Sequence, residues 1–265
     1  MDPLRHYLLA LQYFTRIPVT GRLAQWAGYS PARLRASAAH FPGVGALVGL
    51  CAAGVALALL FVLKPAAPAA LVAAVLSTVV SVLLTGALHE DGLADVADGL
   101  GGSLDRDRAL AIMKDSRVGA FGALALVLAL LSKVSLLALI GAMDARALGV
   151  GLVLAHVVSR TWPLLLIRWL PHVGDASGSK SKPLADQISG VSLAAAFAWL
   201  LLALGLAAWA QGPLFVVTPV VASLMALLVM FWLFRRRLGG FTGDCLGATQ
   251  QVCEIAFYLG LALAS

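Results

Sequence analysis

Carboxylate side chains crowd into one short segment of this chain. Seven of its 13 acidic residues lie between positions 90 and 115 of 265. Asp91, Asp95 and Asp98 are spaced i, i+4 and i+7, which places all three on one face of a helix. Like charges repel and burying them is costly, so the spacing predicts a bound cation. Hard oxygen ligands with glycines between them suit Mg²⁺ and a phosphate-bearing substrate. The plainer alternative is a polar helix end that faces the cytosol.

A second polar segment, residues 113–122 (MKDSRVGAFG), follows about one helix later. Lys114 and Arg117 are suited to neutralising phosphate oxygens, the first as a point charge and the second as a planar fork. Asp115 between them is a candidate metal ligand or base, and Gly119 allows a close backbone approach. The alternative is a basic anchor at a membrane surface.

A third polar segment, residues 239–251 (GGFTGDCLGATQQ), connects two apolar runs near the C-terminus. Asp244 is the only acid in it and could be another metal ligand or a base. Thr249 and Gln250 could hold ribose, base or amide groups of a substrate. The alternative is an ordinary connection between two helices.

Isolated charges within apolar runs carry weaker signals. His156 and Arg160 are spaced i, i+4, so they share a helix face, and phosphate contact and structural partner are both open. Lys133 is expected to extend toward the membrane surface. The Arg235–Arg237 triplet is expected to set orientation and contact anionic lipid.

Composition identifies the fold class and excludes several functions. Hydrophobic residues make up 61% of the chain, charged residues 12%, and mean hydropathy is +0.93. These values predict an all-α, polytopic membrane bundle that forms a single membrane-embedded domain over residues 1–265. The basic residues are scattered among loops, so a nucleic-acid partner is not expected. The three cysteines match neither a disulfide framework nor a metal motif.

The elements that must position these residues follow from hydropathy. Residues 4–17 predict an amphipathic helix at the membrane surface. About seven membrane spans are expected after it. They cover residues 43–63, 67–88, 118–140, 146–170, 190–210, 213–234 and 250–264; the last is short, so it could be tilted, re-entrant or packed inside the bundle.

Basic residues orient this bundle. With the N-terminus inside, nearly all loop arginines and lysines, including Lys180 and Lys182, fall on the cytoplasmic side, whereas the opposite loops hold Lys64 and Arg146. The three polar segments then share the cytoplasmic side of the membrane.

The three segments together resemble the cobalamin synthase family, the adenosylcobinamide-GDP ribazoletransferases. The resemblance extends from near residue 8 to the C-terminus, and one departure is Cys245, where the family more often has Thr. The residues that carry it are 14–18 (FTRIP), 41–45 (FPGVG), 88–100 (LHEDGLADVADGL), 112–122 and 243–250 (GDCLGATQ).

The resemblance implies an enzyme of the cell inner membrane that requires Mg²⁺. It would join adenosylcobinamide-GDP to α-ribazole, or to α-ribazole 5′-phosphate, and release GMP in a late step of cobalamin synthesis. Asp91, Asp95, Asp98 and Asp244 are the expected metal ligands, and Lys114, Asp115 and Arg117 complete the catalytic set. The expected substrate contacts are His89, Gly92, Gly99, Ser116, Gly119, Arg160, Gly243, Thr249 and Gln250.

Two other classes remain as alternatives at this stage. A CDP-alcohol phosphotransferase also places Asp and Gly at a helix end, but an Ala-Arg pair is expected there and Ala94 is followed by Asp95. A cation-coupled transporter usually has its site near the membrane midplane, often within repeated halves, and no internal repeat is visible. The expected partners are small-molecule substrates and the lipid bilayer. Self-association and contact with other enzymes of the pathway are left open.

Overall fold

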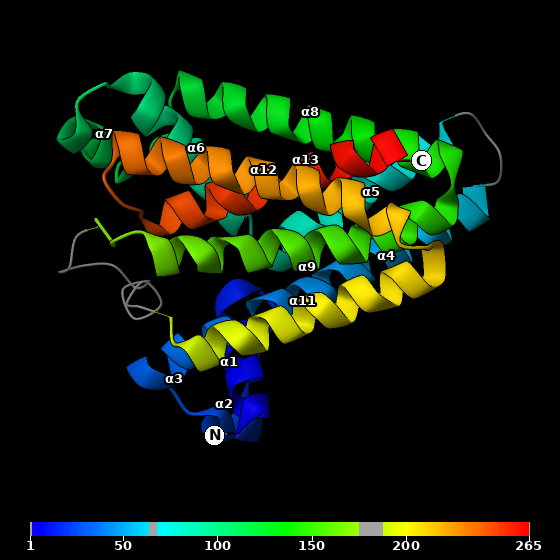
Figure 1. The fold of residues 1–265 in the computed structure, drawn as a ribbon, viewed down its shortest axis with the longest axis horizontal. Coiled ribbons are helices and arrows are strands. Elements are labelled where there is room, and N and C mark those ends of the chain that lie inside the picture. Colours follow the sequence, from blue (N-terminus) through cyan, green and yellow to red (C-terminus); the bar gives the residue numbers. More distant parts are fainter. Residues whose placement is uncertain (1, 64–67, 175–187, 265) are drawn as a thin grey trace.

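The computed structural model describes residues 2–63, 68–174 and 188–264. In these ranges the regular structure is helical, with one isolated parallel bridge between His172 and Phe241. Long helices lie side by side along the long axis of the molecule (Figure 1), which confirms the all-α bundle. Lys64, Lys180 and Lys182 lie outside the described residues. The long helices are α4 (Phe41–Leu63), α5 (Ala69–Thr85), α8 (Ala120–Met143), α9 (Ala145–Trp169), α11 (Gly190–Gln211), α12 (Leu214–Arg237) and α13 (Gly243–Ala264).

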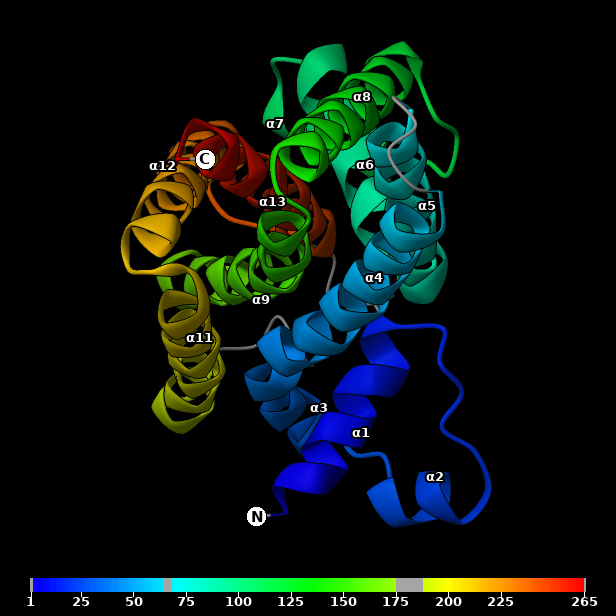
Figure 2. The ribbon, with the colours of Figure 1, turned by 90° about the vertical axis from the view of Figure 1, so that its right-hand side faces the viewer.

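The predicted N-terminal helix is present as α1 (Pro3–Phe14). Asp2 caps it, because its carboxylate accepts a hydrogen bond from the Leu4 amide at 3.2 Å. Two short helices, α2 (Gly21–Ala27) and α3 (Pro31–Ser37), follow and lie with α1 beside one end of α4 (Figure 2). A 3₁₀ turn, η1 (Ala38–His40), then leads into α4.

α9 is the central helix of the bundle, and 83% of its most apolar window is buried. Glycines let α4 approach it closely, since a Cβ on Gly49 would lie 2.7 Å from the Cα of Val153. Gly45 lies one turn earlier and packs against the backbone of His156. This small-xxx-small spacing is the usual way for membrane helices to pack at short distance.

The number of spans is smaller than the seven predicted. Among the described residues, five helices are long and apolar enough to cross a membrane, or six if α5 and the helix that follows it form one bent crossing. α5 has only 17 residues and carries four buried hydroxyl side chains. α13 has buried polar side chains along its first half, so it is packed inside the bundle, which is one of the three arrangements expected for it.

The hydroxyl face of α5 is satisfied within its own helix. Ser77, Thr78, Ser81 and Thr85 each donate a hydrogen bond to a carbonyl three or four residues earlier, at 2.8–3.1 Å. These side chains therefore add polarity to the bundle interior without leaving unpaired donors.

Two short helices lie at one end of the bundle. They are α6 (Leu88–Gly102) and α7 (Arg106–Met113), and the C-terminus lies at the other end (Figure 1). The starts of α8 and α13 meet α6, so the three polar segments of the sequence share this end. The bundle thus brings together residues that are more than 150 positions apart.

Candidate functional site

α6 begins at a sharp elbow after α5. The two helix axes differ by 89°, and Gly86 and Ala87 both have left-handed backbone angles, with φ of +66° and +58°. Glycine adopts these backbone angles without steric cost. A side chain at position 86 would also collide with Arg16, whose side chain packs directly against Gly86. α6 therefore runs nearly perpendicular to α5 at this end of the bundle.

Four carboxylates gather where α6 meets the first turn of α13. Asp91 is exposed, Asp95 is half-buried and Asp98 is buried on α6, and Asp244 lies at the start of α13. Burial raises the pKa of Asp95 to about 7, and the nearby carboxylates of Asp244, Asp91 and Asp98 add to this shift. Burial also raises the pKa of Asp244, against the hydrogen bond that it accepts from the Thr242 hydroxyl at 3.2 Å. The structure thus brings together the four residues predicted as metal ligands.

Close helix contact explains two of the glycines in this region. A Cβ on Gly92 would lie 2.8 Å from the carbonyl oxygen of Asp244, and one on Gly99 would lie 2.9 Å from that of Ala109. Both glycines were predicted as substrate contacts. In the structure each of them accommodates a neighbouring helix, which is the physical reason for a residue without a side chain.

Asp98 has a structural task that the sequence did not indicate. Its two carboxylate oxygens accept hydrogen bonds from the amides of Gly119 at 2.7 Å and Gly122 at 2.8 Å, so it caps the N-terminus of α8 from another helix. Side chains at either glycine would overlap this carboxylate. Gly119, predicted as a substrate contact, is therefore needed here for the approach of Asp98.

The basic segment forms an exposed loop between α7 and α8. Arg117 does not stand alone, because its backbone amide and its guanidinium both bond the carboxylate of Asp115, with Nε 3.0 Å from Oδ1. These bonds lower the pKa of Asp115 to about 2. Lys114 and Ser116 are exposed in the same loop. The loop is open to solvent and anions, but its Asp115 and Arg117 are paired with each other.

The start of α13 presents Gly243 and Asp244 at the same end. Thr242 precedes the helix, and its hydroxyl bonds both the Asp244 carboxylate and, at 3.5 Å, the sulfur of Cys245. Cys245 is fully buried. The departure expected at this position therefore concerns an interior contact and not the exposed surface near Asp244.

Four other predicted substrate contacts are buried in the bundle interior: Thr249, Gln250, Arg160 and His89. Thr249 donates to the carbonyl of Cys245 at 2.7 Å. Gln250 uses its amide nitrogen on Ser159 at 3.0 Å and on Glu254 at 2.6 Å. No side-chain surface of either residue is exposed to a substrate in this arrangement.

Arg160 and His89 are also buried. Arg160 Nη1 lies 2.7 Å from His156 Nδ1, so the structure favours a partner within the protein for this arginine. His89 stacks on Phe41 with ring centroids 5.8 Å apart, and its Nε2 has no partner among the described residues. His89 belongs to the first turn of α6 and Arg160 to α9, and both side chains lie inside the bundle.

The prediction for Lys133 is wrong. Its ammonium group does not extend to the membrane surface; it is 1% exposed and lies 2.7 Å from the carboxylate of Glu254. The sequence holds the signal, because Lys133 and Glu254 are each an isolated charge in an apolar run, and such charges are expected to find a partner. The sequence analysis had not paired them.

Arg235 and Arg236 are exposed, and for them contact with anionic lipid stays a prediction. Arg237 instead donates to the carbonyls of Leu100 at 3.1 Å and Ser103 at 2.7 Å. These are unsatisfied carbonyls at the C-terminus of α6, where a positive charge is favourable. Arg237 therefore holds the acidic helix in place.

The four carboxylates do not form a closed metal cage by themselves. Across residues 2–63, 68–174 and 188–264, no three His, Cys, Asp or Glu side chains converge closely enough to hold a metal ion. The donor set is nevertheless of the right chemistry, since Mg²⁺ usually binds one or two carboxylates and completes its shell with water and substrate phosphates.

Comparison with known proteins decides the family. The sequence profile described as cobalamin-5-phosphate synthase matches residues 6–262. The chain belongs to this family. Relatives named adenosylcobinamide-GDP ribazoletransferase are 62% identical in Albidiferax ferrireducens and 60% identical in Polaromonas naphthalenivorans, each over 98% of both chains. A relative with the same name in Vibrio cholerae is 42% identical over 96% of this chain and 91% of its own. No solved structure matches the chain.

Membership of this family confirms the resemblance seen in the sequence. It also decides against the CDP-alcohol phosphotransferase and transporter alternatives. The match includes all three polar segments, so the end of the bundle where they meet is the candidate active site.

Proposed function

We propose that this chain joins adenosylcobinamide-GDP to α-ribazole, or to α-ribazole 5′-phosphate, and releases GMP. The product is adenosylcobalamin or its 5′-phosphate. The names of the relatives give the reaction, and one observation of the structure supports its location: the carboxylates of α6 and α13 lie near one another at one end of the bundle, beside an exposed basic loop.

Mg²⁺ fits this end of the bundle. Burial, together with the neighbouring carboxylates, raises the pKa of Asp95 to about 7, and a cation would relieve the repulsion among them. Asp91 and Asp95 are the principal ligands in this proposal, and Asp244, the fourth predicted ligand, serves as the proton acceptor. Asp98 already bonds two backbone amides, so it acts chiefly by orienting α6 against α8. When bound, the ion supplies charge neutralisation at the diphosphate.

The chemistry is a phosphoryl-type transfer in which the protein mainly positions groups and stabilises charge. A ribose hydroxyl oxygen of α-ribazole forms a bond to the cobinamide-side phosphorus, and the bond from that phosphorus to the oxygen of GMP breaks. Asp244 suits the role of proton acceptor better than Asp115, whose pKa Arg117 holds at about 2. Lys114 and Arg117 in the exposed loop bind the phosphates of the diphosphate and of the departing GMP.

The proposed location is the cell inner membrane, with this end of the bundle in the cytoplasm. Positive charge supports it, because Arg106, Arg108, Lys114 and Arg117 are grouped at this end. Water-soluble nucleotide substrates would then reach the carboxylates without crossing the membrane.

The test is product formation by the detergent-solubilised protein given adenosylcobinamide-GDP and each acceptor, with and without Mg²⁺. Chromatography should show adenosylcobalamin or its 5′-phosphate together with an equal amount of GMP, only when Mg²⁺ is present. A folded protein that gives no product with either acceptor contradicts the proposed reaction. Equal turnover after removal of divalent ions by a chelator contradicts the metal assignment alone.

A further inference from the structure

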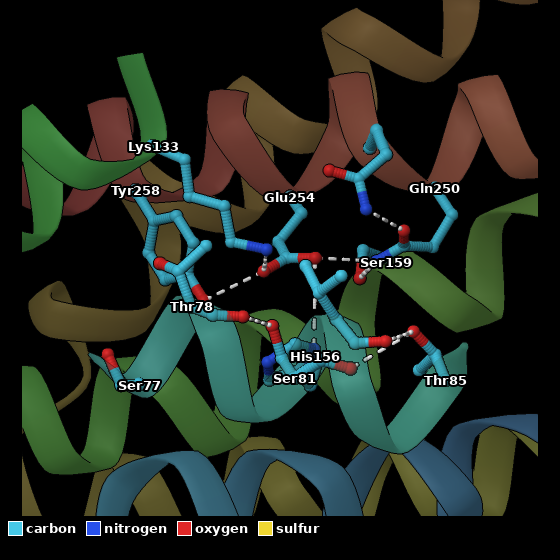
Figure 3. Close-up of polar contacts among 12 residues, drawn as sticks. Ser77, Thr78, Ser81, Thr85, Lys133, His156, Ser159, Gln250, Glu254 and Tyr258 are labelled. Carbon is cyan, nitrogen blue, oxygen red and sulfur yellow. Dashed lines mark hydrogen bonds and ion pairs between the residues drawn. The ribbon is translucent and has the colours of Figure 1, made fainter. Parts of the chain in front are cut away.

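A buried carboxylate organises the interior of the bundle. Glu254 of α13 is fully buried, and its oxygens accept hydrogen bonds from Lys133 Nζ at 2.7 Å, the Tyr258 hydroxyl at 3.0 Å and Gln250 Nε2 at 2.6 Å. Figure 3 shows Lys133, Tyr258 and Gln250 converging on it from α8 and from neighbouring turns of α13. Glu254 thereby joins α13 to α8 at a fixed height in the bundle.

The hydrogen bonds continue from Glu254 to the acidic helix. The side-chain oxygen Oε1 of Gln250 accepts a hydrogen bond from Gln251 Nε2 at 2.9 Å, and the same nitrogen donates to Oε1 of Glu90 in α6 at 3.0 Å. Glu90 and Gln251 are 8% and 3% exposed. A continuous chain of four side chains, Glu90–Gln251–Gln250–Glu254, therefore links the middle of the bundle to the residue next to Asp91.

Stability alone is a poor reason for such a chain. Burying carboxylates is costly, and well-packed apolar side chains often stabilise as much or more than a buried ion pair does. Glu90 Oε2 even lacks a partner among the described residues. Directional hydrogen bonds do, however, specify one arrangement of two helices where apolar packing allows several, as buried polar residues do in coiled coils.

Asp98 and Arg237 hold the C-terminal half of α6 against α8 and α12, so the first turns of α6, next to the elbow, need a constraint of their own. These turns meet α13 closely at two glycines, since a Cβ on Gly92 would lie 2.8 Å from the Asp244 carbonyl and one on Gly247 would lie 3.3 Å from the Cα of His89. Such close contacts set the distance between the two helices, but a glycine has no side chain whose hydrogen bonds could fix their rotation or register. A change in either would carry Asp91 and Asp95 away from Asp244.

We propose that the Glu90–Gln251–Gln250–Glu254 chain is a positioning device that fixes α6 on α13 and so holds Asp91 and Asp95 against Asp244. Its four members are positioning residues and do not touch substrate. The consequence for catalysis rests on the function proposed above, whereas the consequence for helix placement does not.

The test variant is Gln251→Met, which removes the nitrogen that bonds both Glu90 and Gln250 but keeps the side-chain length. The matched control is Ser223→Ala. Ser223 is equally buried, accepts from Trp162 Nε1 at 2.9 Å and donates to the Cys253 carbonyl at 2.9 Å, so it also joins helices, but it has no link to α6. Thermal unfolding in detergent measures the stability cost of each change.

Helix placement is measured by the distance between spin labels at Leu104→Cys, just after α6, and Leu263→Cys, near the end of α13. Both positions are exposed, and the partly exposed Cys51 is replaced by alanine. We expect a broadened or shifted distance distribution in Gln251→Met and an unchanged one in Ser223→Ala.

We also expect kcat to fall tenfold or more in Gln251→Met with little change in KM, since a small misplacement of reacting groups has a large effect on rate. Ser223→Ala should stay within about twofold of the parent protein, because it leaves the positioning of α6 intact.

If Gln251→Met does not fold, a second pair of variants at Glu90 tests the same hydrogen bond. Glu90→Gln keeps an acceptor for Gln251, whereas Glu90→Leu removes it; the distribution should stay narrow in the first and broaden in the second. Narrow distributions in both Gln251→Met and Glu90→Leu would overturn the proposal. The distance measurement needs no substrate, so it remains decisive even if the parent protein fails to form cobalamin.

Discussion

Two groups of charged residues in this protein differ in whether like or opposite charges lie together. At the end of the bundle, Asp91, Asp95, Asp98 and Asp244 bring like charges together in a partly exposed place. In the middle of the bundle, Lys133 and Glu254 bring opposite charges together with side chains that are 2% and 0% exposed. The first group is electrostatically incomplete, and the second is already neutralised.

This difference separates a site for ligands from a structural element. Like charges that remain near water repel one another, and a cation bound from outside would relieve that repulsion, which is the basis of the metal site proposed above. Opposite charges enclosed by apolar helices neutralise each other, so they indicate a fixed arrangement of those helices. The residues of both groups can be found in the sequence, but only the structure shows whether a carboxylate lies beside like or opposite charges.

The largest expected effect comes from breaking the ion pair between Lys133 and Glu254. Lys133→Met leaves the Glu254 carboxylate buried without its cation, which should lower the free energy of unfolding by about 3–5 kcal/mol. Denaturation in mixed detergent micelles measures the change. The double variant K133M/E254Q removes both charges and should recover most of the loss. A single variant as stable as the parent would show that the pair does not hold the helices together.

The next largest effect concerns the carboxylates at the end of the bundle. Asp95→Asn should lower turnover by about 10²–10³-fold, by analogy with the loss of one strong electrostatic contact in a transition state, and should leave the fold intact. Asp107→Asn is the control, because Asp107 lies on neighbouring α7 with its side chain 85% exposed. Initial rates at saturating Mg²⁺ measure both variants. Near-parental turnover of Asp95→Asn would remove this carboxylate from the active site.

A third change tests whether Asp98 belongs with the structural residues or with the ligand-binding ones. Gly122→Ala places a methyl group against the Asp98 carboxylate and should destabilise the protein by about 1–3 kcal/mol, as overpacking does. Gly54→Ala is the control, since nothing lies within 4 Å of a Cβ at that position. If thermal unfolding shows equal stability for the two variants, the cap on α8 is unimportant.

The smallest effect sharpens the role of the exposed loop. Arg117→Ala should lower kcat/KM by roughly tenfold, the value of one charge-assisted contact to a phosphate. Asp115→Asn breaks the same ion pair but keeps the guanidinium, so it should have a weaker effect. Steady-state kinetics with adenosylcobinamide-GDP compares them. Equal losses would mean that Arg117 serves only to shape the loop around Asp115.

Much of the fold could be predicted because the physics is local. An apolar run of about 20 residues forms a helix in a membrane whatever surrounds it, so the main helices were found within a few residues. The errors concern α5 and α13, where polar side chains occur within apolar runs. Their burial depends on which helices cover them, and hydropathy does not contain that information.

The candidate site shows the same division. The i, i+4, i+7 spacing predicted that Asp91, Asp95 and Asp98 share a helix face, and the structure adds Asp244 beside them. The spacing could not show that two glycine amides occupy Asp98, or that Arg117 pairs with Asp115. Gly92 and Gly99 illustrate the limit, since a glycine that admits a substrate and one that admits a neighbouring helix look alike in sequence.

The sequence by itself determined the membrane class, the helical runs, the family and the crowding of carboxylates, because each depends on residue type and on spacing along a single element. The tertiary structure alone decided that α6 turns across the end of the bundle, that Lys133 meets Glu254, and that a chain of side chains leads from Glu254 to Glu90. Those contacts join residues up to 161 positions apart. They arise because a charge or amide that leaves water must find its partner on another helix.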